Sequence, residues 1–581
     1  MDTNNITSGI TNKAKDNNST SKNIQERKIV GRKKDKIYVY FTKDINKHKY
    51  YCNINNCNKF FSNNSSTSTL KNHVITKQCD YYNNIINKDT NIKFTSNMKN
   101  KINIQKAYSR AFAKNSLPHS LLENKYFNEF ITAIKENPEV TISKRELREL
   151  IIFDGNKLKS DIIQNLKNSK QPITLAFDGW TNVRTNKVIN LMLIANGNIY
   201  YYDSIENKEK QNTKEYLLSL FIDKINKLLN EGLNLIAITT DNEILMKSTC
   251  NDLVKTFPIL LNIPCSAHLI QLCLKNICNS KTFKTTVDKL INLLNSFKNN
   301  KQNRLNLSNL QLADNIKIPL KIIYPTMVRW SSIIISIERI LELKKYIVNI
   351  PLCNNDDNFW EQLLFFYDSI KEIKNYTNII QKDNSSLHTV LNCFNKMITF
   401  YSSKKNDAFS SVVNIIDQYW TKYIDKNLIN VIKLLCFEFL IKPEKELREF
   451  ISSWGALYLQ KYNLTEEKNE EKVKKILSIQ LNRLIVRQKE FSKLEELIAE
   501  TNSDEENVDN LTYVFKLVWG KLMTHCYELS KVAIAILSIC PSEACVERSF
   551  SILSNIHTLE RNNLREDLID AELSIKINLK H

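Results

Sequence analysis

The sequence has 581 residues, which is long enough for roughly three or four domains of about 150 residues each. Hydrophobic residues make up 42% of the chain and charged residues 25%, so much of it can form a buried core. Only 8 residues are glycine, and no two of them lie within six positions of each other. Phosphate-binding loops and dinucleotide fingerprints need closely spaced glycines, so the composition excludes P-loop enzymes, kinases and ordinary NAD enzymes.

Positive charge is concentrated near the N-terminus. The chain carries 82 Lys and Arg residues and 62 Asp and Glu residues. Residues 1–120 alone hold 22 of the basic residues but only 7 of the acidic ones. Such a block predicts a segment that binds a polyanion, although a solvated disordered tail has the same composition. We expect residues 1–36 to be a disordered basic tail in which Arg32, Lys33 and Lys34 contact phosphates or serve as a nuclear-localisation signal.

Cysteine usage indicates a reducing compartment and a metal site. No cleavable signal and no long apolar span is visible, so we expect an intracellular, nuclear protein without a membrane partner. In that setting, clustered cysteines are more often metal ligands than disulfide partners. The pattern Cys52-x4-Cys57-x15-His73-x5-Cys79 offers four ligands typical of structural Zn²⁺. We therefore predict a zinc finger over residues 37–82, the alternative being four unrelated residues.

Strand patterns begin only after residue 170. Residues 83–165 are predicted to be a helical DNA-binding or dimerisation region, with helices at 126–136 and 144–153. Over residues 166–300 the predicted order is three strands, a helix and a fourth strand, then two helices around a short apolar segment. The strands are expected at 173–177, 188–195, 199–203 and 235–240, and the helices at 213–230, at 243–257 and from 266 onward.

The rest of the chain has almost unbroken helical patterning. Apolar residues recur at helical spacing from about 331 to 530, which predicts an all-helical domain over residues 301–535 without an internal repeat. Residues 536–581 hold two further helices, expected at 542–556 and 564–577. The last helix has an apolar stripe typical of core packing, formed by Leu564, Leu568, Ala571 and Ile575.

Two aspartates follow predicted strands. Asp178 comes directly after Ile-Thr-Leu-Ala-Phe, and Asp241 after Leu-Ile-Ala-Ile-Thr-Thr. Taken alone, an aspartate in such a place is usually a turn residue or a helix cap. In an RNase H-like fold, however, these two strand ends lie side by side, and carboxylates there can share hard divalent cations such as Mg²⁺.

Five motifs, taken in order, carry a resemblance to a known family. They are Phe177-Asp178-Gly179-Trp180-Thr181, Thr240-Asp241-Asn242, Cys265-Ser266-Ala267-His268, Arg329-Trp330 and the segment Ser542–Ser551, which contains Glu547. Together they resemble the hAT superfamily of cut-and-paste DNA transposases. Residues 37–43, the cysteine pair and the segment Ser68–His73 look like a BED-type zinc finger.

The resemblance implies an architecture and an activity. The fold would be α+β and multidomain, with an RNase H-like α/β catalytic core interrupted by a large all-helical insertion and an N-terminal zinc finger. Asp178, Asp241 and Glu547 would hold catalytic Mg²⁺ or Mn²⁺ for two-metal-ion phosphoryl transfer. Residues 166–300 and 536–581 would form the core, and the C-terminal helix would support a homo-oligomer. The residues implied in DNA contact are Trp180, His268, Arg329 and Trp330.

Two functions agree with this resemblance. One is an active transposase that binds terminal inverted repeats of double-stranded DNA, cleaves the DNA and transfers the excised 3′-OH ends to target DNA. The alternative is a domesticated, transposase-derived transcriptional regulator with a DNA-binding finger and no catalytic activity. All three acidic residues are present, which favours the enzyme.

Glu543 competes with Glu547 for the third acidic position, because residues four apart share a helix face. A helix that starts near Pro541 places Val546 and Phe550 on an apolar stripe, with Glu547 beside it. Glu543 would fall in the first turn, where the helix dipole stabilises a carboxylate. We therefore interpret Glu543 as a helix-end residue and expect Glu543→Gln to leave cleavage nearly intact.

Overall fold

The computed structural model describes residues 41–73 and 107–579, with short gaps. The gaps are residues 45–46, 54–56, 58, 63, 67–68, 71–72, 114–116, 182–185, 208–212, 327–330, 352–356, 405, 439–443, 504–510 and 559–563. Six predicted site residues lie outside the described part of the chain: Arg32, Lys33, Lys34, Cys79, Arg329 and Trp330. The chain divides into two compact units, residues 1–141 and 142–581, and each is described by itself.

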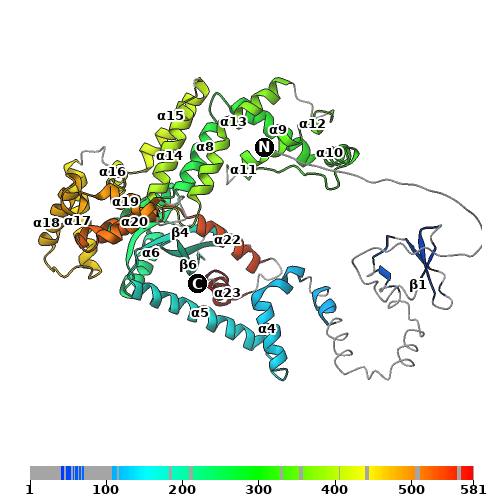
Figure 1. Cartoon of the computed structure of the whole chain (residues 1–581), viewed down its shortest axis with the longest axis horizontal. Helices are drawn as coiled ribbons and strands as arrows, with labels where there is room; N and C mark the ends of the chain where they lie inside the picture. Colours follow the sequence, from blue (N-terminus) through cyan, green and yellow to red (C-terminus); the bar gives the residue numbers. More distant parts are fainter. Residues whose placement is uncertain are drawn as a thin grey trace, which may run out of the picture. The chain divides into compact units, whose positions relative to one another are not determined.

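The first unit contains a small antiparallel sheet (Figure 1). Its strands are β1 (Phe41–Asp44), β2 (Lys49–Cys52) and β3 (Phe60–Ser62), paired in that order. Phe41, Leu70 and His73 are buried beside the sheet, and the ring centroid of Phe61 lies 4.8 Å from that of His73. Later in this unit come η2 (His119–Glu123) and α4 (Lys125–Glu136).

The second unit is built on a mixed five-stranded sheet with the order β6-β5-β4-β7-β8. The strands are β4 (Ile173–Thr181), β5 (Lys187–Ala195), β6 (Asn198–Asn207), β7 (Leu235–Thr240) and β8 (Leu261–Pro264). β4, β5 and β6 form an antiparallel meander, whereas β7 and β8 run parallel to β4. The four predicted strands are present, and β4 continues to Thr181, so Asp178 lies inside the strand and not after it.

Alternate residues of the central strands face two different cores, as the side-chain period of a strand requires. Leu175, Phe177 and Leu191 point into the larger core, where the ring of Phe177 lies 4.1 Å from that of Phe221. Ala176 and Met192 point to the opposite face, into a smaller core. The helices nearest in sequence are α5 (Lys144–Ser169), α6 (Lys214–Asn230), α7 (Ile244–Thr256) and α8 (Ser266–Cys278). The sheet is therefore covered on both sides.

The helical part that follows shares the larger core with the sheet. Its helices are α9 (Lys284–Asn299), α10 (Lys301–Ala313), α11 (Ser332–Glu342), α12 (Lys344–Ile347), α13 (Asp357–Ile380), α14 (Leu387–Ser402), α15 (Asp407–Tyr423), α16 (Lys426–Leu435), α17 (Lys445–Lys461), α18 (Glu470–Ile485), η3 (Lys489–Phe491), α19 (Leu494–Ser503), α20 (Leu511–Leu522) and α21 (Tyr527–Leu537). Helix α17 and the residue after it attach this part to the sheet. Trp454 Nε1 donates to the carbonyl of Ile259 at 3.0 Å, and the hydroxyl of Tyr462 donates to the carbonyl of Leu235 at 2.5 Å. A helix apolar and long enough to span a bilayer does not occur among the described residues.

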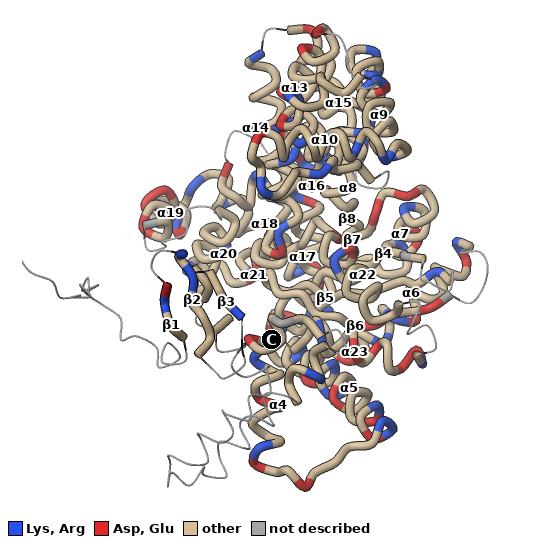
Figure 2. The backbone as a smooth tube through the Cα atoms, turned by 90° about the vertical axis from the view of Figure 1, so that its right-hand side faces the viewer, with Lys and Arg blue, Asp and Glu red and all other residues tan. Residues whose placement is uncertain are grey.

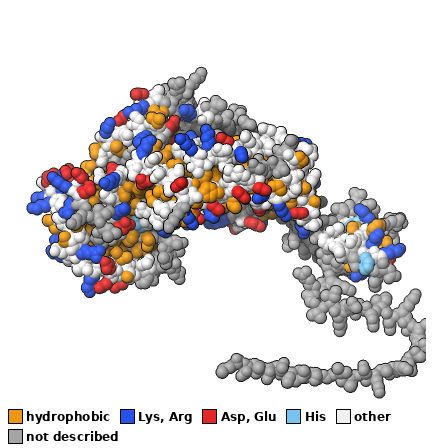
Figure 3. Space-filling model, turned by 90° about the horizontal axis from the view of Figure 1, so that it is seen from above, with side chains coloured by type: hydrophobic (Ala, Val, Ile, Leu, Met, Phe, Trp, Pro, Cys, Tyr) orange, Lys and Arg blue, Asp and Glu red, His pale blue; other side chains and the backbone are white. Residues whose placement is uncertain are grey.

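Acidic and basic side chains are mixed over the second unit. Figure 2 shows Lys and Arg interspersed with Asp and Glu along its helices, and Figure 3 shows the same mixture on the face that it presents. On that face neither sign of charge forms a single continuous patch. The N-terminal excess of positive charge therefore remains the main electrostatic signal for a polyanion partner.

The last two helices cover the second face of the sheet. Val546, Leu553 and Ile556 of α22 (Ala544–Ile556) are buried in the smaller core against β4 and β5. α23 (Glu566–Asn578) packs against α5 and β6. Because a Cβ on Gly155 would come within 2.7 Å of Ala571 Cα, α5 and α23 can approach this closely only with glycine at position 155.

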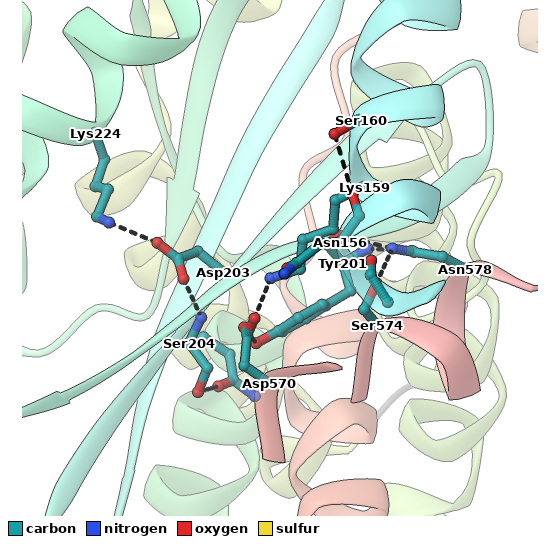
Figure 4. Close-up of polar contacts among 12 residues, drawn as sticks. Asn156, Lys159, Ser160, Tyr201, Asp203, Ser204, Lys224, Asp570, Ser574 and Asn578 are labelled. Carbon is teal, nitrogen blue, oxygen red and sulfur yellow. Dashed lines mark hydrogen bonds and ion pairs between the residues drawn. The ribbon is translucent and has the colours of Figure 1, made fainter. Parts of the chain in front are cut away.

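A polar network fixes α23 to α5 and β6 (Figure 4). Lys159 Nζ lies 2.5 Å from a carboxylate oxygen of Asp570, and the hydroxyl of Tyr201 donates to the other oxygen at 2.6 Å. The Asn578 side chain accepts a hydrogen bond from the Tyr201 N–H at 2.8 Å and donates one to the Tyr201 carbonyl at 3.0 Å. The C-terminal helix is thereby tied to an edge strand that precedes it by most of the chain.

Candidate active site and cysteine–histidine cluster

The strand register brings Asp178 and Asp241 together. β4 and β7 are parallel, with Leu175 opposite Ile238 and Ala176 opposite Thr239. Continuing that register by two residues sets Asp178 beside Asp241, and neighbouring strands lie about 4.8 Å apart. Asp178 Oδ1 accepts a hydrogen bond from the Gly179 N–H at 2.6 Å, and Asp241 Oδ1 accepts one from the Glu243 N–H at 3.2 Å.

The environment of Asp178 disfavours its charged form. Burial is the main cause that raises the pKa of Asp178 to about 7, and the negative charges of Asp241, Glu547 and Glu243 add to the shift. The hydrogen bond from Gly179 opposes the shift but does not cancel it. A carboxyl group with a raised pKa among other acids is a common feature of catalytic and cation-binding sites.

The peptide before α22 is attached to the sheet and to α8. Thr239 Oγ1 donates to the carbonyl of Cys540 at 2.8 Å, and the Cys540 N–H donates to Thr174 Oγ1 at 3.1 Å. The Ser266 N–H, at the start of α8, donates to the carbonyl of Pro541 at 2.8 Å. These bonds position the N-terminus of α22 beside β4, β7 and the start of α8.

Buried hydrogen bonds hold α22 in place along the sheet. The Asn190 amide of β5 donates to Ser549 Oγ at 2.8 Å, and the same Asn190 accepts from the hydroxyl of Ser204 at 2.8 Å. Glu547 lies two residues before Ser549 and is close enough to Asp178 to raise its pKa. Arg548 pairs instead with Asp383 of the helical part, and Arg565 pairs with Asp567. The neighbouring arginines that could have made Glu547 an ordinary surface ion-pair residue therefore have other partners.

Glu543 lies at the N-terminal end of α22, as expected, but the structure contradicts the interpretation that the helix end stabilises its carboxylate. Helix α22 begins at Ala544, and the Glu543 side chain makes no capping hydrogen bond. The side chain is only 1% exposed, and its Oε2 atom is buried without a hydrogen-bond partner in the described structure. Burial raises the pKa of Glu543 well above its usual range, and Asp178, Asp241 and Glu547 raise it further. Four acidic residues thus meet at this site, where the sequence predicted three.

These acids fit the divalent cation that two-metal-ion chemistry needs. Mg²⁺ prefers oxygen ligands and binds through a few carboxylates while retaining waters. The site offers carboxylate oxygens from two strands and from the segment at the start of α22, and the like charges of these acids raise the pKa values of Asp178 and Glu543. Cys265, which is buried nearby, accepts a hydrogen bond at its Sγ from the Glu543 N–H at 3.4 Å. Burial and the nearby Glu543 charge raise the pKa of the Cys265 thiol well above its usual range, so it supports the site as a neutral group.

A pocket opens beside Asp241, between the sheet and the helical part. Its lining includes Asn242, Lys247, Asn262 and Tyr423. Lys247 Nζ lies 4.9 Å from the centroid of the Tyr423 ring. No local sequence pattern predicts this pocket, because Tyr423 belongs to α15 and reaches the site only through the fold.

The remaining predicted site residues are placed with less detail. The backbone of Trp180 pairs with Val188 in the sheet, next to Asp178, and its side chain lies outside what the structure describes. His268 is half-buried in the first turn of α8, one turn after Cys265. Trp180 lies two residues after Asp178 and His268 lies one turn after Cys265, and the contact of either residue with DNA stays a prediction.

Three of the four predicted zinc ligands meet in the first unit. Cys52, Cys57 and His73 have ligand atoms within 4.8 Å of one another, and they are the one such His, Cys, Asp and Glu cluster in the described residues. Cys57 Sγ lies 3.2 Å from His73 Nε2. Thiolate and imidazole are the ligands that structural zinc prefers, so this set fits the ion.

Comparison with known proteins gives two family matches in the chain. Residues 151–292 match a domain of unknown function, DUF659, and residues 491–579 match the hAT family C-terminal dimerisation region. The second match covers α22 and α23 and therefore both glutamates of the site. One similar solved structure is titled "Drosophila P element transposase strand transfer complex"; it has 13% identity, covers 73% of this chain and 98% of that chain, and gives a TM-score of 0.25. No curated protein sequence matches the chain significantly.

Proposed function

We propose that this chain, which belongs to the hAT family of transposase-type proteins, is a cut-and-paste DNA transposase. It binds the terminal inverted repeats of a DNA element, cleaves the DNA and transfers the excised 3′-OH ends to target DNA. The observation that carries the proposal is the convergence of Asp178, Asp241 and Glu547, from β4, β7 and α22, at one partly buried site. The strand order, with a meander followed by two parallel strands, supports an RNase H-like assignment for the core.

The acids give the chain a place for divalent cations. Asp178, Asp241 and Glu547 would hold Mg²⁺ or Mn²⁺, and such ions activate the attacking oxygen and stabilise the leaving one in phosphoryl displacement. The chain itself fixes the geometry, because Gly179 and Glu243 backbone N–H groups orient the two aspartates and the Asn190–Ser549 bond fixes α22. These contacts hold the two aspartates and α22 in place, and bound cations would draw the carboxylates closer together.

Other parts of the chain would bring DNA to this site. Trp180, His268, Arg329 and Trp330 would contact DNA near the acids. A BED-type finger around Cys52, Cys57, His73 and Cys79, with Arg32, Lys33 and Lys34 beside it, would bind the repeats with an affinity that falls with salt. The C-terminal dimerisation region supports a homo-oligomer, and we place the protein in the nucleus, where its DNA substrate lies.

A cleavage assay tests the proposal. Inverted repeats flanking the gene supply the sequence of the labelled duplex, which is incubated with the full chain and Mg²⁺. We expect strand cleavage and joining to target DNA, and we expect Asp178→Asn, Asp241→Asn and Glu547→Gln each to reduce cleavage by several orders of magnitude while repeat binding remains. Glu243→Gln is the control, because the Glu243 side chain is exposed and its backbone N–H is unchanged.

The second function is the domesticated DNA-binding regulator. It would be favoured if the full chain binds the repeats tightly and cleaves nothing with either Mg²⁺ or Mn²⁺. Cleavage that persists undiminished in all three acid variants would show that the nuclease site lies elsewhere and would contradict the proposed assignment.

A further inference from the structure

Glu543 occupies a position that the surrounding hydrogen bonds fix firmly. Its own N–H donates to Cys265 Sγ, and the residues just before it are bonded to β4, β7 and α8. Because the backbone is held at several points, the carboxyl group cannot leave the site by a small shift of a loose helix end.

The Glu543 side chain is isolated from water and from cations of the protein. It is 1% exposed, Oε2 has no hydrogen-bond partner, and no Lys or Arg ion pair with it occurs among the residues described. Asp178, Asp241 and Glu547 are its charged neighbours, and all three disfavour its ionised form. A buried acid surrounded by acids costs folding free energy, so its presence calls for a compensating partner.

We propose that Glu543 is a fourth carboxylate ligand of the divalent cations bound at the Asp178–Asp241–Glu547 site. The inference rests on the proposed function, because it needs the same cations. Two divalent ions carry four positive charges, and three carboxylates leave one of these charges uncompensated. Glu543 supplies the fourth negative charge from the side of the site that solvent does not reach.

The proposal predicts opposite effects of one substitution with and without metal. Glu543→Gln keeps the size of the side chain and removes a buried acid, so the metal-free protein should melt at the same or a higher temperature than the wild type. The same variant should lose much of the stabilisation that Mn²⁺ gives, because a ligand that binds only the folded state stabilises it according to its affinity. The second effect decides, because a glutamate with no part in cation binding would leave the stabilisation by Mn²⁺ unchanged.

The experiment is a Mn²⁺ titration of the full-length, zinc-loaded chain, followed by electron paramagnetic resonance of free Mn²⁺ and by thermal unfolding. For Glu543→Gln we expect a rise of at least about tenfold in the Kd for Mn²⁺, or the loss of one bound ion. Glu243→Gln removes an exposed negative charge that also acts on Asp178, so it measures the purely electrostatic effect and should change the Kd by less than about threefold. Glu543→Asp keeps a carboxylate and should bind Mn²⁺ better than the Gln variant does.

Each outcome decides a different question. If Glu543→Gln binds Mn²⁺ with wild-type affinity and stoichiometry while Asp178→Asn loses binding, this inference is wrong and the proposed function stays intact. Wild-type Mn²⁺ binding in Asp178→Asn, Asp241→Asn and Glu547→Gln alike would overturn the proposed cation site and the inference with it. If Glu543→Gln does not fold, the Asp variant decides, because a ligand moved back by one methylene must weaken Mn²⁺ binding whereas a non-ligand must not.

Discussion

The amide of Asn190 in β5 donates a hydrogen bond of 2.8 Å to the hydroxyl of Ser549 in α22, across 359 positions of sequence. Asn190 is fully buried and Ser549 is 1% exposed, so water cannot replace either partner. This bond lies two residues from Glu547 and couples the position of that acid to the strand next to β4. The third acidic residue is thus oriented by the sheet as well as by its own helix.

Removing the hydroxyl of Ser549 should loosen α22. Ser549→Ala removes the acceptor of the Asn190 amide N–H, and a buried donor without an acceptor costs about 1–3 kcal/mol. We expect α22 amides to exchange hydrogen faster by a corresponding factor, with β7 amides unchanged, as measured by hydrogen–deuterium exchange. Asn190→Ala combined with Ser549→Ala should cost less than the sum of the single changes, because the two residues share one interaction. Strict additivity would show that the bond does not couple the helix to the sheet.

The close crossing of α5 and α23 gives a second prediction. Gly155→Ala places a methyl group 2.7 Å from the backbone of Ala571, so the two helices must move apart. We expect a loss of about 1–3 kcal/mol and a lower melting temperature. Gly520→Ala is the control: a Cβ at that helical position meets nothing within 4 Å, and alanine should stabilise the helix by about 1 kcal/mol. Equal melting temperatures for the two variants would contradict the crossing.

Asp178 should make the stability of the metal-free protein depend on pH. Its pKa is about 7 in the folded protein against 3.8 for the free group, so the folded state holds the proton more tightly. The stabilisation from that proton is present at low pH and is lost as the pH rises toward 7, by roughly 4 kcal/mol at most. Melting temperatures measured between pH 5 and pH 8 in magnesium-free buffer should therefore fall, and Asp178→Asn should flatten the curve. An identical pH profile in the variant would contradict the raised pKa.

The cysteine–histidine cluster should bind one zinc ion. Cys57→Ser removes one of the ligands that lie within 4.8 Å of one another, so the zinc content of the purified full chain should drop from one ion toward none. We expect the same result for Cys79→Ser, since the sequence assigns that residue to the fourth ligand position. Elemental analysis provides the measurement, and Cys393→Ser, a buried cysteine of α14, is the control. Full zinc content in Cys57→Ser would exclude the predicted site.

The basic N-terminal segment should dominate the salt dependence of DNA binding. Neutralising Arg32, Lys33 and Lys34 to Gln in the full chain removes up to three phosphate contacts, each of which contributes about 0.9 to the slope of log K against log salt. We expect a shallower slope by about 2–3 for the triple variant, measured by fluorescence anisotropy on duplex DNA. The control replaces three exposed lysines of the second unit with Gln and should leave the slope within about 1 of wild type. These lysines are Lys468, Lys489 and Lys576. Equal slopes for the two triple variants would move the DNA site to the globular part.

The sequence predicts the elements of the sheet well because their signal is local. The run Leu235–Thr240 is buried throughout, and its observed bounds equal the predicted ones. β4 shows the limit of that signal: Gly179 and Trp180 read as the end of a strand, yet pairing with β5 extends it to Thr181. Similarly, the sequence predicts a helix only over residues 144–153, but α5 continues to Ser169 and packs against α23 along this extension.

The candidate site was predictable only in part. Asp178 and Asp241 lie next to recognisable apolar strand runs, and Glu547 lies in a recognisable motif. Glu543 showed one usable signal, its spacing of four residues from Glu547. Its burial depends on a bond to Cys265, which is 278 positions away, and no local pattern reveals such a contact.

The placement of α22 at the far end of the chain also sets an order of events during synthesis. All five strands of the sheet have been synthesised by residue 264, but α22 and α23, which cover its second face, come only after the whole helical part. At roughly 5–20 residues per second, that face with Ala176 and Met192 stays bare for on the order of tens of seconds. That apolar face is covered only once α22 and α23 have been made, and any product truncated before Pro541 lacks both Glu543 and Glu547.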